Sequence, residues 1–156
     1  MSASTPDATT PLADAPAARL VAAYEGLRPD NLHGLLSLYD EQARFQDPFN
    51  EVRGREAIGR IFRHMFETLD EPRFVVTRAV GQGTDLFLTW DFHFRRRPGS
   101  APMHIQGATH LELAPDGRVL SHRDYWDAAQ ELYAKLPLLG ALMRWLQGLL
   151  RTPQPG

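Results

Sequence analysis

The chain has 156 residues, a formal net charge of −2 at pH 7 and no cysteine. This length suits one domain with a buried core. The charge offers no electrostatic basis for binding nucleic acid, and the lack of cysteine excludes disulfides and thiol nucleophiles. The N-terminus has neither the basic start nor the apolar core of a secretory signal, so we expect a cytoplasmic protein. We expect a disordered tail at 1–13, one domain at 14–150 and a short tail at 151–156.

Residues 14 to 39 have the pattern of a helical hairpin. Asp14 is a candidate N-cap, and apolar residues then recur at helical spacing until Arg28-Pro29: Leu20, Val21, Tyr24 and Leu27. A shorter second helix is predicted to carry Leu32, Leu35, Leu36 and Tyr39. Each helix would have one apolar face.

A short strand is predicted at 43–47, where Pro48 ends it. Ala43, Phe45 and Asp47 share one face of this strand, which places an acid beside apolar neighbours. After a loop at 49–54, the clearest helical pattern of the chain follows, with apolar residues at Ile58, Ile61, Phe62, Met65, Phe66 and Leu69. We expect this long helix to pack against a sheet.

From Arg73 onward the hydrophobic period changes from 3.6 to 2. Four strands are predicted, at 73–80, 86–96, 103–113 and 118–126, and short turns separate them. Turns of this length connect antiparallel neighbours. The order of elements predicts an α+β fold: a cone-shaped, curved antiparallel sheet wrapped around the long helix, with the helical hairpin closing its open side.

Two strands present mixed faces that could line a cavity. In the last strand, His122, Asp124 and Trp126 share one face. In the strand at 86–96, Asp91 and His93 lie opposite an almost wholly apolar face. Parity alone does not decide which face is concave, so Asp91 and His93 could instead face solvent.

The C-terminal part is predicted to hold a short helix at 128–136 and an apolar helix at 138–150. The second is too short for a membrane span, which needs roughly 20 residues. We expect it to serve as a subunit contact, giving a homodimer, or as a lid.

Four motifs together resemble the nuclear transport factor 2-like superfamily, which includes ketosteroid isomerase, limonene-epoxide hydrolase and the SnoaL-like polyketide cyclases. The resemblance covers about residues 17 to 135, and the motifs that carry it are Tyr24-Glu25-Gly26-Leu27, Phe45-Gln46-Asp47-Pro48, Gly54-Arg55-Glu56-Ala57-Ile58 and Arg123-Asp124-Tyr125-Trp126-Asp127. The resemblance implies the cone fold. It is less specific for a reaction, since one fold carries many functions.

The resemblance implies only part of each relative's catalytic set. The ketosteroid isomerase base matches Asp47, whereas its two oxyanion donors fall on Ala23 and Thr109. One limonene-epoxide hydrolase aspartate matches Asp124, but its other catalytic positions fall on Asp91, His93, Phe45 and Asp47. The SnoaL-like cyclases are held to use acid/base chemistry without a cofactor, so the resemblance implies that class of chemistry for the acids and histidine that remain.

We therefore expect a small, largely apolar ligand and cofactor-free acid/base chemistry of the isomerase, cyclase or hydrolase type. The expected catalytic residues are Asp124, Asp47, His93 and Asp91. The expected ligand-binding residues are Phe45, Tyr24, Phe62, Thr109, His122 and Trp126. No metal is expected, because the spacing carries no metal-binding signature. Two alternatives stay open: Asp47 could simply bond the loop after Pro48, and the cone could hold a ligand or partner without catalysis.

Overall fold

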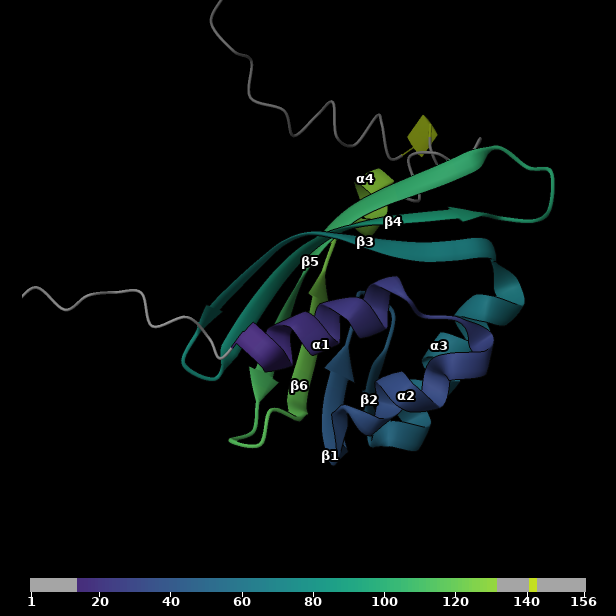
Figure 1. Cartoon of the computed structure of the whole chain (residues 1–156). Coiled ribbons are helices and arrows are strands. Elements are labelled where there is room, and N and C mark those ends of the chain that lie inside the picture. The colour runs from purple at the N-terminus through teal and green to yellow at the C-terminus, as the bar shows by residue number, and fades with distance from the viewer. Residues whose placement is uncertain (1–13, 132–140, 143–156) are drawn as a thin grey trace, which may run out of the picture.

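The computed structural model of the chain describes residues 14–131 together with residues 141 and 142. The elements follow in the order α1 (Asp14–Glu25), η1 (Pro29–Asn31), α2 (Leu32–Ser37), β1 (Tyr39–Gln46), β2 (Glu51–Arg53), α3 (Arg55–Thr68), β3 (Asp70–Gln82), β4 (Asp85–Arg95), β5 (Pro102–Leu113), β6 (Val119–Tyr125) and α4 (Ala128–Glu131). The long strands β3, β4 and β5 arch over α1, while α2 and α3 lie beside the other end of the sheet (Figure 1). This confirms the predicted α+β fold with a curved, unclosed sheet.

The described strands form one six-stranded sheet in the order β2-β1-β6-β5-β4-β3. The three hairpins from β3 to β6 are antiparallel, as the short turns predicted. β1 and β6, however, pair in parallel, with Phe45 opposite His122. This pairing joins segments far apart in the sequence, and no local pattern indicated it.

Two element boundaries differ from the prediction around β1. Tyr39 was predicted at the end of the second helix, but α2 ends at Ser37 and Tyr39 is the first residue of β1. The three-residue strand β2 lies in the segment that was predicted as a loop. Gly54 follows it with a φ of 92° and donates its N–H to the Ala43 carbonyl at 2.8 Å. A positive φ suits glycine, so the chain can turn here from β2 into α3.

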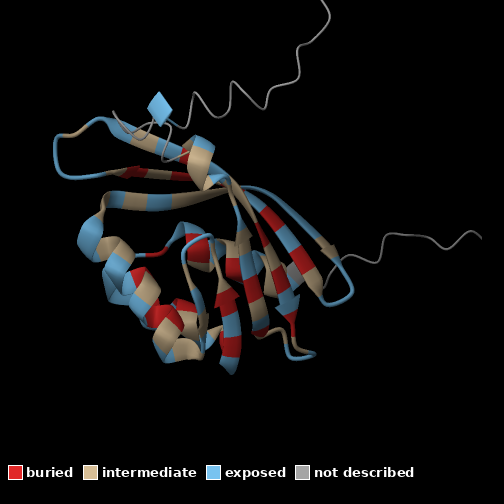
Figure 2. Ribbon diagram, turned by 180° about the vertical axis from the view of Figure 1, so that it is seen from behind, coloured by how far each residue is buried: buried red, intermediate tan, exposed pale blue. Residues whose placement is uncertain are grey.

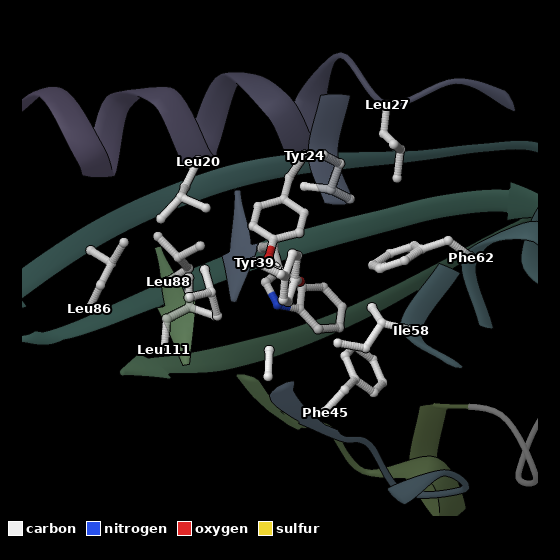
Figure 3. Packing of buried hydrophobic residues seen from close by; sticks show 14 of the residues in the cluster. Leu20, Tyr24, Leu27, Tyr39, Phe45, Ile58, Phe62, Leu86, Leu88 and Leu111 are labelled. Carbon is white, nitrogen blue, oxygen red and sulfur yellow. Dashed lines mark hydrogen bonds between the residues drawn. The ribbon is translucent and has the colours of Figure 1, made fainter. Parts of the chain in front are cut away.

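The core lies between the concave face of the sheet and the helices (Figures 2 and 3). From α3, Ile58 and Phe62 are buried against it. The alternating residues of β4 that face this core are all buried: Leu86, Leu88, Trp90, Phe92 and Phe94. The almost wholly apolar face of β4 is therefore the concave one.

The described part of the C-terminal region is short. After α4, only Ala141 and Leu142 of the predicted apolar helix at 138–150 are described, and both are helical. The rest of that helix, and the tails predicted at 1–13 and 151–156, lie outside the described residues. None of the helices in the described ranges has the length and hydropathy to cross a membrane.

Candidate functional site

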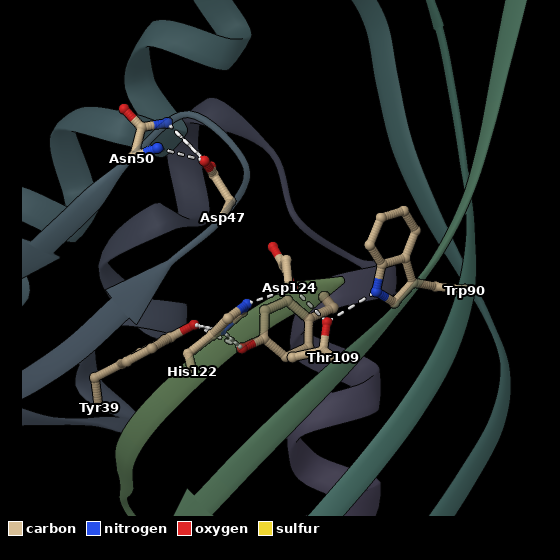
Figure 4. Close-up of polar contacts among 8 residues, drawn as sticks. Tyr39, Asp47, Asn50, Trp90, Thr109, His122 and Asp124 are labelled. Carbon is tan, nitrogen blue, oxygen red and sulfur yellow. Dashed lines mark hydrogen bonds and ion pairs between the residues drawn. The ribbon is translucent and has the colours of Figure 1, made fainter. Parts of the chain in front are cut away.

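A continuous hydrogen-bonded network crosses the inside of the cone (Figure 4). Asp124 of β6 is its centre: Oδ1 contacts His122 Nε2 at 2.8 Å and accepts from the Thr109 hydroxyl at 2.5 Å. Thr109 in turn accepts a hydrogen bond from the Trp90 indole N–H at 2.8 Å. Strand pairing sets this geometry, because Thr109 of β5 lies directly opposite Asp124 and Leu88.

Two tyrosines complete the network on the other side of His122. The Tyr39 hydroxyl lies 2.7 Å from His122 Nδ1 and 2.6 Å from the Tyr24 hydroxyl, which is itself 3.2 Å from Nδ1. His122 is 3% exposed and Tyr39 is fully buried. Helix α1 and strands β1 and β6 therefore meet at one imidazole.

The protonation pattern of the network follows from its chemistry. Burial raises the pKa of Tyr24 above its ordinary value, and burial together with the neighbouring Tyr24 raises that of Tyr39. Both phenols therefore keep their protons at neutral pH. With Asp124 as a carboxylate that can only accept, we assign the His122 proton to Nε2, and Nδ1 then accepts from Tyr39. The Tyr24 hydroxyl then donates to the Tyr39 oxygen, so the longer 3.2 Å contact between Tyr24 and Nδ1 has no proton of its own.

A narrow apolar cavity adjoins the network. Its walls come from six elements, α1, α3 and β3 to β6, and the residues that line it are Tyr24, Phe62, Phe74, Val76, Leu88, Trp90, Thr109, His122 and Asp124. The volume open to the centre of a water molecule is about 20 Å³, and roughly 10–15 Å³ is enough for one water. A larger ligand would need some of these side chains to move.

Asp124 also lines a second, open depression at the end of β6. This depression has a volume of about 530 Å³ and includes Asp47, Trp126 and Asp127. The Asp124 side chain is 18% exposed. Among the described residues, no group hydrogen-bonds its second oxygen, Oδ2, which points toward Asp47 in Figure 4. One carboxylate thus faces both the apolar cavity and the outside.

Most of the predicted ligand-binding residues meet at the narrow apolar cavity. Tyr24, Phe62, Thr109 and His122 line it. Phe45 instead packs on the His122 ring, with 4.5 Å between ring centroids, and does not line the cavity. Trp126 lies at the open depression, in edge contact with Phe49.

Sequence reasoning missed Tyr39 and the role of Trp90 in the network. The available signals were weak. Tyr39 was taken as the last apolar residue of a helix, and Trp90 as one more member of an apolar strand face. A buried tyrosine or tryptophan normally finds a hydrogen-bond partner, so both polar tips could have been expected near other polar groups.

Asp47 is engaged by its own loop. Its Oδ1 accepts from the backbone N–H groups of Phe49 and Asn50, each at 2.7 Å, and the Asn50 side-chain amide contacts both oxygens. This is the local bonding that was left open as an alternative for Asp47. The carboxylate holds the turn after Pro48 at the rim of the depression.

The structure does not bring Asp91 and His93 to the cavity, which corrects their expected grouping with Asp124. Both lie on the convex face of β4, because the alternate residues of that strand fill the core. Asp91 contacts Gln106 and His104 across the strand pair, and these hydrogen bonds lower its pKa. His93 stacks on His104.

Comparison with known proteins identifies a family for this chain. The SnoaL-like domain family matches residues 20–122, which includes most of the network. No match was found among curated protein sequences.

Several solved structures share the fold. A Catenulispora acidiphila protein with a ketosteroid isomerase-like fold, crystallised with trimethylamine, aligns with a TM-score of 0.67 and 19% identity over 86% of this chain and 96% of its own. A putative SnoaL-like polyketide cyclase from Shewanella putrefaciens gives 0.64 and 19%, over 80% and 95%. A Mycobacterium tuberculosis protein in complex with estradiol-17beta-hemisuccinate gives 0.60 and 14%, over 72% and 94%. The solved structures show that the fold is of the ketosteroid isomerase-like and NTF2-like type, and the family match over residues 20–122 shows that the chain belongs to the SnoaL-like domain family.

Proposed function

We propose that this protein binds a small, largely apolar molecule in the cone and transfers a proton on it, with Asp124 as the general acid/base. The observation that carries the proposal is the position of Asp124. One oxygen is held by Thr109 and His122, and the other is directed to the opening without a partner among residues 14–131. A general base needs a carboxylate that is fixed in place and has one oxygen within reach of a substrate.

The proposed step is a proton transfer alone. Asp124 Oδ2 removes a proton from an acidic C–H or O–H of the ligand, so that bond breaks, its electron pair stays on the ligand, and a new O–H bond forms on the carboxyl. Return of the proton to another atom of the ligand would complete an isomerisation. In a ring closure, the carbanion would attack a carbonyl carbon of the same ligand, the C=O π bond would break, and the proton would return to the resulting alkoxide oxygen. Such a step needs no redox cofactor.

The buried network holds Asp124 in place for this transfer. His122 donates Nε2–H to Asp124 Oδ1, and the Tyr39 hydroxyl, which donates to Nδ1, fixes this tautomer of the imidazole. Tyr24 in turn contacts the Tyr39 hydroxyl. His122 and the two tyrosines therefore act through Asp124, as positioning residues.

The cavity walls support an apolar ligand with few polar groups. The space beside Asp124 is surrounded by apolar side chains, namely those of Phe62, Phe74, Val76, Leu88 and Trp90. The ligands of two solved neighbours suggest further candidates, since one neighbour was crystallised with an estradiol derivative and another with polyporic acid. Oxo-steroids, terpenoids and aromatic polyketide mimics are thus the classes to screen first, with epoxides as a further class.

The experiment begins with a thermal-shift screen of these classes, including estradiol-17beta-hemisuccinate. A ligand at 100 times its Kd adds about 2.7 kcal/mol of stability, which raises Tm by several degrees in a domain of this size. For a hit with an acidic C–H, proton exchange with D2O is then followed by NMR. We expect Asp124→Asn to slow the exchange about 100-fold or more while ligand affinity changes little.

Two matched variants sharpen this experiment. Asp127→Asn alters an exposed carboxylate three residues further along, and asparagine can keep its hydrogen bond to the Gln130 N–H. It should exchange at the wild-type rate. Asp47→Asn keeps acceptors for the loop but removes a charge, so it tests whether Asp47 shares the proton transfer. Wild-type exchange in Asp124→Asn would rule out the proposed role of Asp124.

A non-catalytic ligand-binding or accessory protein is the second candidate, and the small cavity favours it. Space for about one water is less than any of these ligands needs. A hit that binds tightly but undergoes no exchange or turnover in the wild type would support this alternative. A homodimer and a cytoplasmic location remain predictions from the sequence.

A further inference from the structure

A cluster of two histidines and one carboxylate lies on the convex face of the sheet, away from the cavity. Asp91 and His93 are two residues apart on β4, and His104 of β5 lies directly opposite His93. One ligand atom from each of the three residues can be chosen so that all lie within 4.8 Å of one another. The spacing along the chain gives no sign of this cluster, since strand pairing creates it.

The contacts within the cluster already approach the geometry of a metal site. His104 Nε2 and Asp91 Oδ1 are 3.0 Å apart, and the rings of His93 and His104 stack with centroids 4.7 Å apart. Donor atoms on a tetrahedral zinc ion with bonds near 2.0–2.1 Å are roughly 3.3 Å apart. Small side-chain rotations would therefore bring all three donors onto one ion, and the backbone could stay in place.

We propose that Asp91, His93 and His104 bind a late first-row divalent cation of the zinc class. Two imidazoles and one carboxylate suit Zn²⁺, Co²⁺ or Ni²⁺ and do not suit Mg²⁺ or Ca²⁺, which prefer oxygen ligands. The cation would replace the proton that now lies between His104 and Asp91. Its fourth position would take water, because the cluster lies on the convex face of the sheet. The cavity of the cone is on the opposite face, so its ligand would not reach the cation.

Two neighbours of the cluster have opposite effects on the binding of a cation. The Gln106 amide donates to Asp91 Oδ1 at 3.0 Å and so orients the carboxylate, as an outer-shell partner does in metal sites. Arg73 of β3 lies opposite His93 on the same face, and its charge opposes a cation. Because Arg73 is exposed, solvent weakens this repulsion.

A second cluster on the same two strands serves as the internal control. Asp85, His110 and Glu112 also have ligand atoms within 4.8 Å of one another. It contains one imidazole, which is bonded to Asp85 at 2.6 Å and stacked on Phe87. With a single nitrogen ligand it should be the weaker site for zinc.

The test is calorimetric titration of the metal-stripped full-length protein with Zn²⁺, repeated with Mg²⁺. We expect saturable binding of one zinc ion, no binding of Mg²⁺, and at least about tenfold weaker binding in His93→Gln and in His104→Gln. His110→Gln should bind as the wild type does, and Arg73→Ser should bind more tightly. With Co²⁺ as the probe, the visible spectrum should report a four-coordinate site that both His93→Gln and His104→Gln abolish.

Three results would overturn the proposal. They are no saturable zinc binding by the wild type, wild-type affinity in His93→Gln and His104→Gln, and loss of binding in His110→Gln alone. Melting curves of the metal-free variants show whether each is folded, so that a loss of affinity is not mistaken for unfolding. None of these variants touches the cavity, so this test is independent of the proposed acid/base function.

Discussion

The Thr109 hydroxyl forms hydrogen bonds with two neighbouring side chains, Trp90 and Asp124. Its hydroxyl has a single proton and accepts the indole N–H of Trp90, so that proton is available to Asp124. Valine has nearly the same shape as threonine but neither function. A threonine that is 4% exposed at this position is therefore explained by hydrogen bonding, whereas packing alone would accept valine.

Thr109→Val should lower the free energy of unfolding by about 1–3 kcal/mol, because it leaves the buried Trp90 N–H without an acceptor and removes one donor from Asp124. Urea unfolding measures this change, and the slope with denaturant should stay the same. Thr109→Ser keeps the hydroxyl, so its free energy of unfolding should fall less than that of Thr109→Val. Equal stability of the valine variant and the wild type would show that the bond contributes nothing.

At the scale of elements, the pairing of β4 with β5 places Trp90 against Gly107. The two residues are directly opposite each other, and a Cβ at position 107 would overlap the indole ring. Glycine within a strand often marks such a close approach. The indole lies over the backbone of β5, and in this position its N–H reaches Thr109.

Gly107→Ala should therefore displace the Trp90 ring and cost about 1–3 kcal/mol, as overpacking of a core does. Thermal unfolding gives the loss, and the NMR signal of the Trp90 indole N–H should shift as its hydrogen bond to Thr109 breaks. Gly34→Ala in α2 is the matched control: a Cβ there meets no atom within 4 Å. That change should stabilise the helix by roughly 0.5–1 kcal/mol, and a similar gain at Gly107 would contradict the packing argument.

At the scale of the whole molecule, the Tyr24, Tyr39 and His122 contacts join α1 to β1 and β6. Both phenols have a raised pKa in the folded chain, chiefly because they are buried. The unfolded chain releases these protons near pH 10, whereas the folded chain keeps them. The stability that depends on them is fully present below pH 10 and is lost as the pH rises above it.

Above pH 10, the free energy of unfolding should fall by about 1.4 kcal/mol per pH unit for each buried phenol. Chemical unfolding at several alkaline pH values measures the slope. The double variant Tyr24→Phe, Tyr39→Phe should have a shallower slope than the wild type, while Tyr125→Phe, which changes a side chain on the exposed face, should not. Identical slopes for the double variant and the wild type would mean that the two phenols ionise in the folded protein.

Local patterns in the sequence were enough to predict the architecture and one face of the site. Short turns determined the antiparallel hairpins, and helical spacing determined the apolar face of α3. Two-residue alternation in the strand predicted at 118–126 grouped His122, Asp124 and Trp126 on one face. Although β6 ends at Tyr125, all three lie at the cavity or its opening. Each of these signals depends only on neighbouring residues.

The tertiary structure decided the rest of the site. Alternation separates the two faces of β4 but does not say which is buried, and packing against α1 and α3 placed Asp91 and His93 outside. Tyr39 joins His122 only because β1 pairs in parallel with β6, across a long stretch of intervening chain. Asp47 has a suitable motif, yet its bonds to Phe49 and Asn50 depend on how the rim of the cone folds. The sequence thus determined which residues share a face, and long-range strand pairing determined which faces meet, because contacts between distant segments leave no periodic signal in either segment.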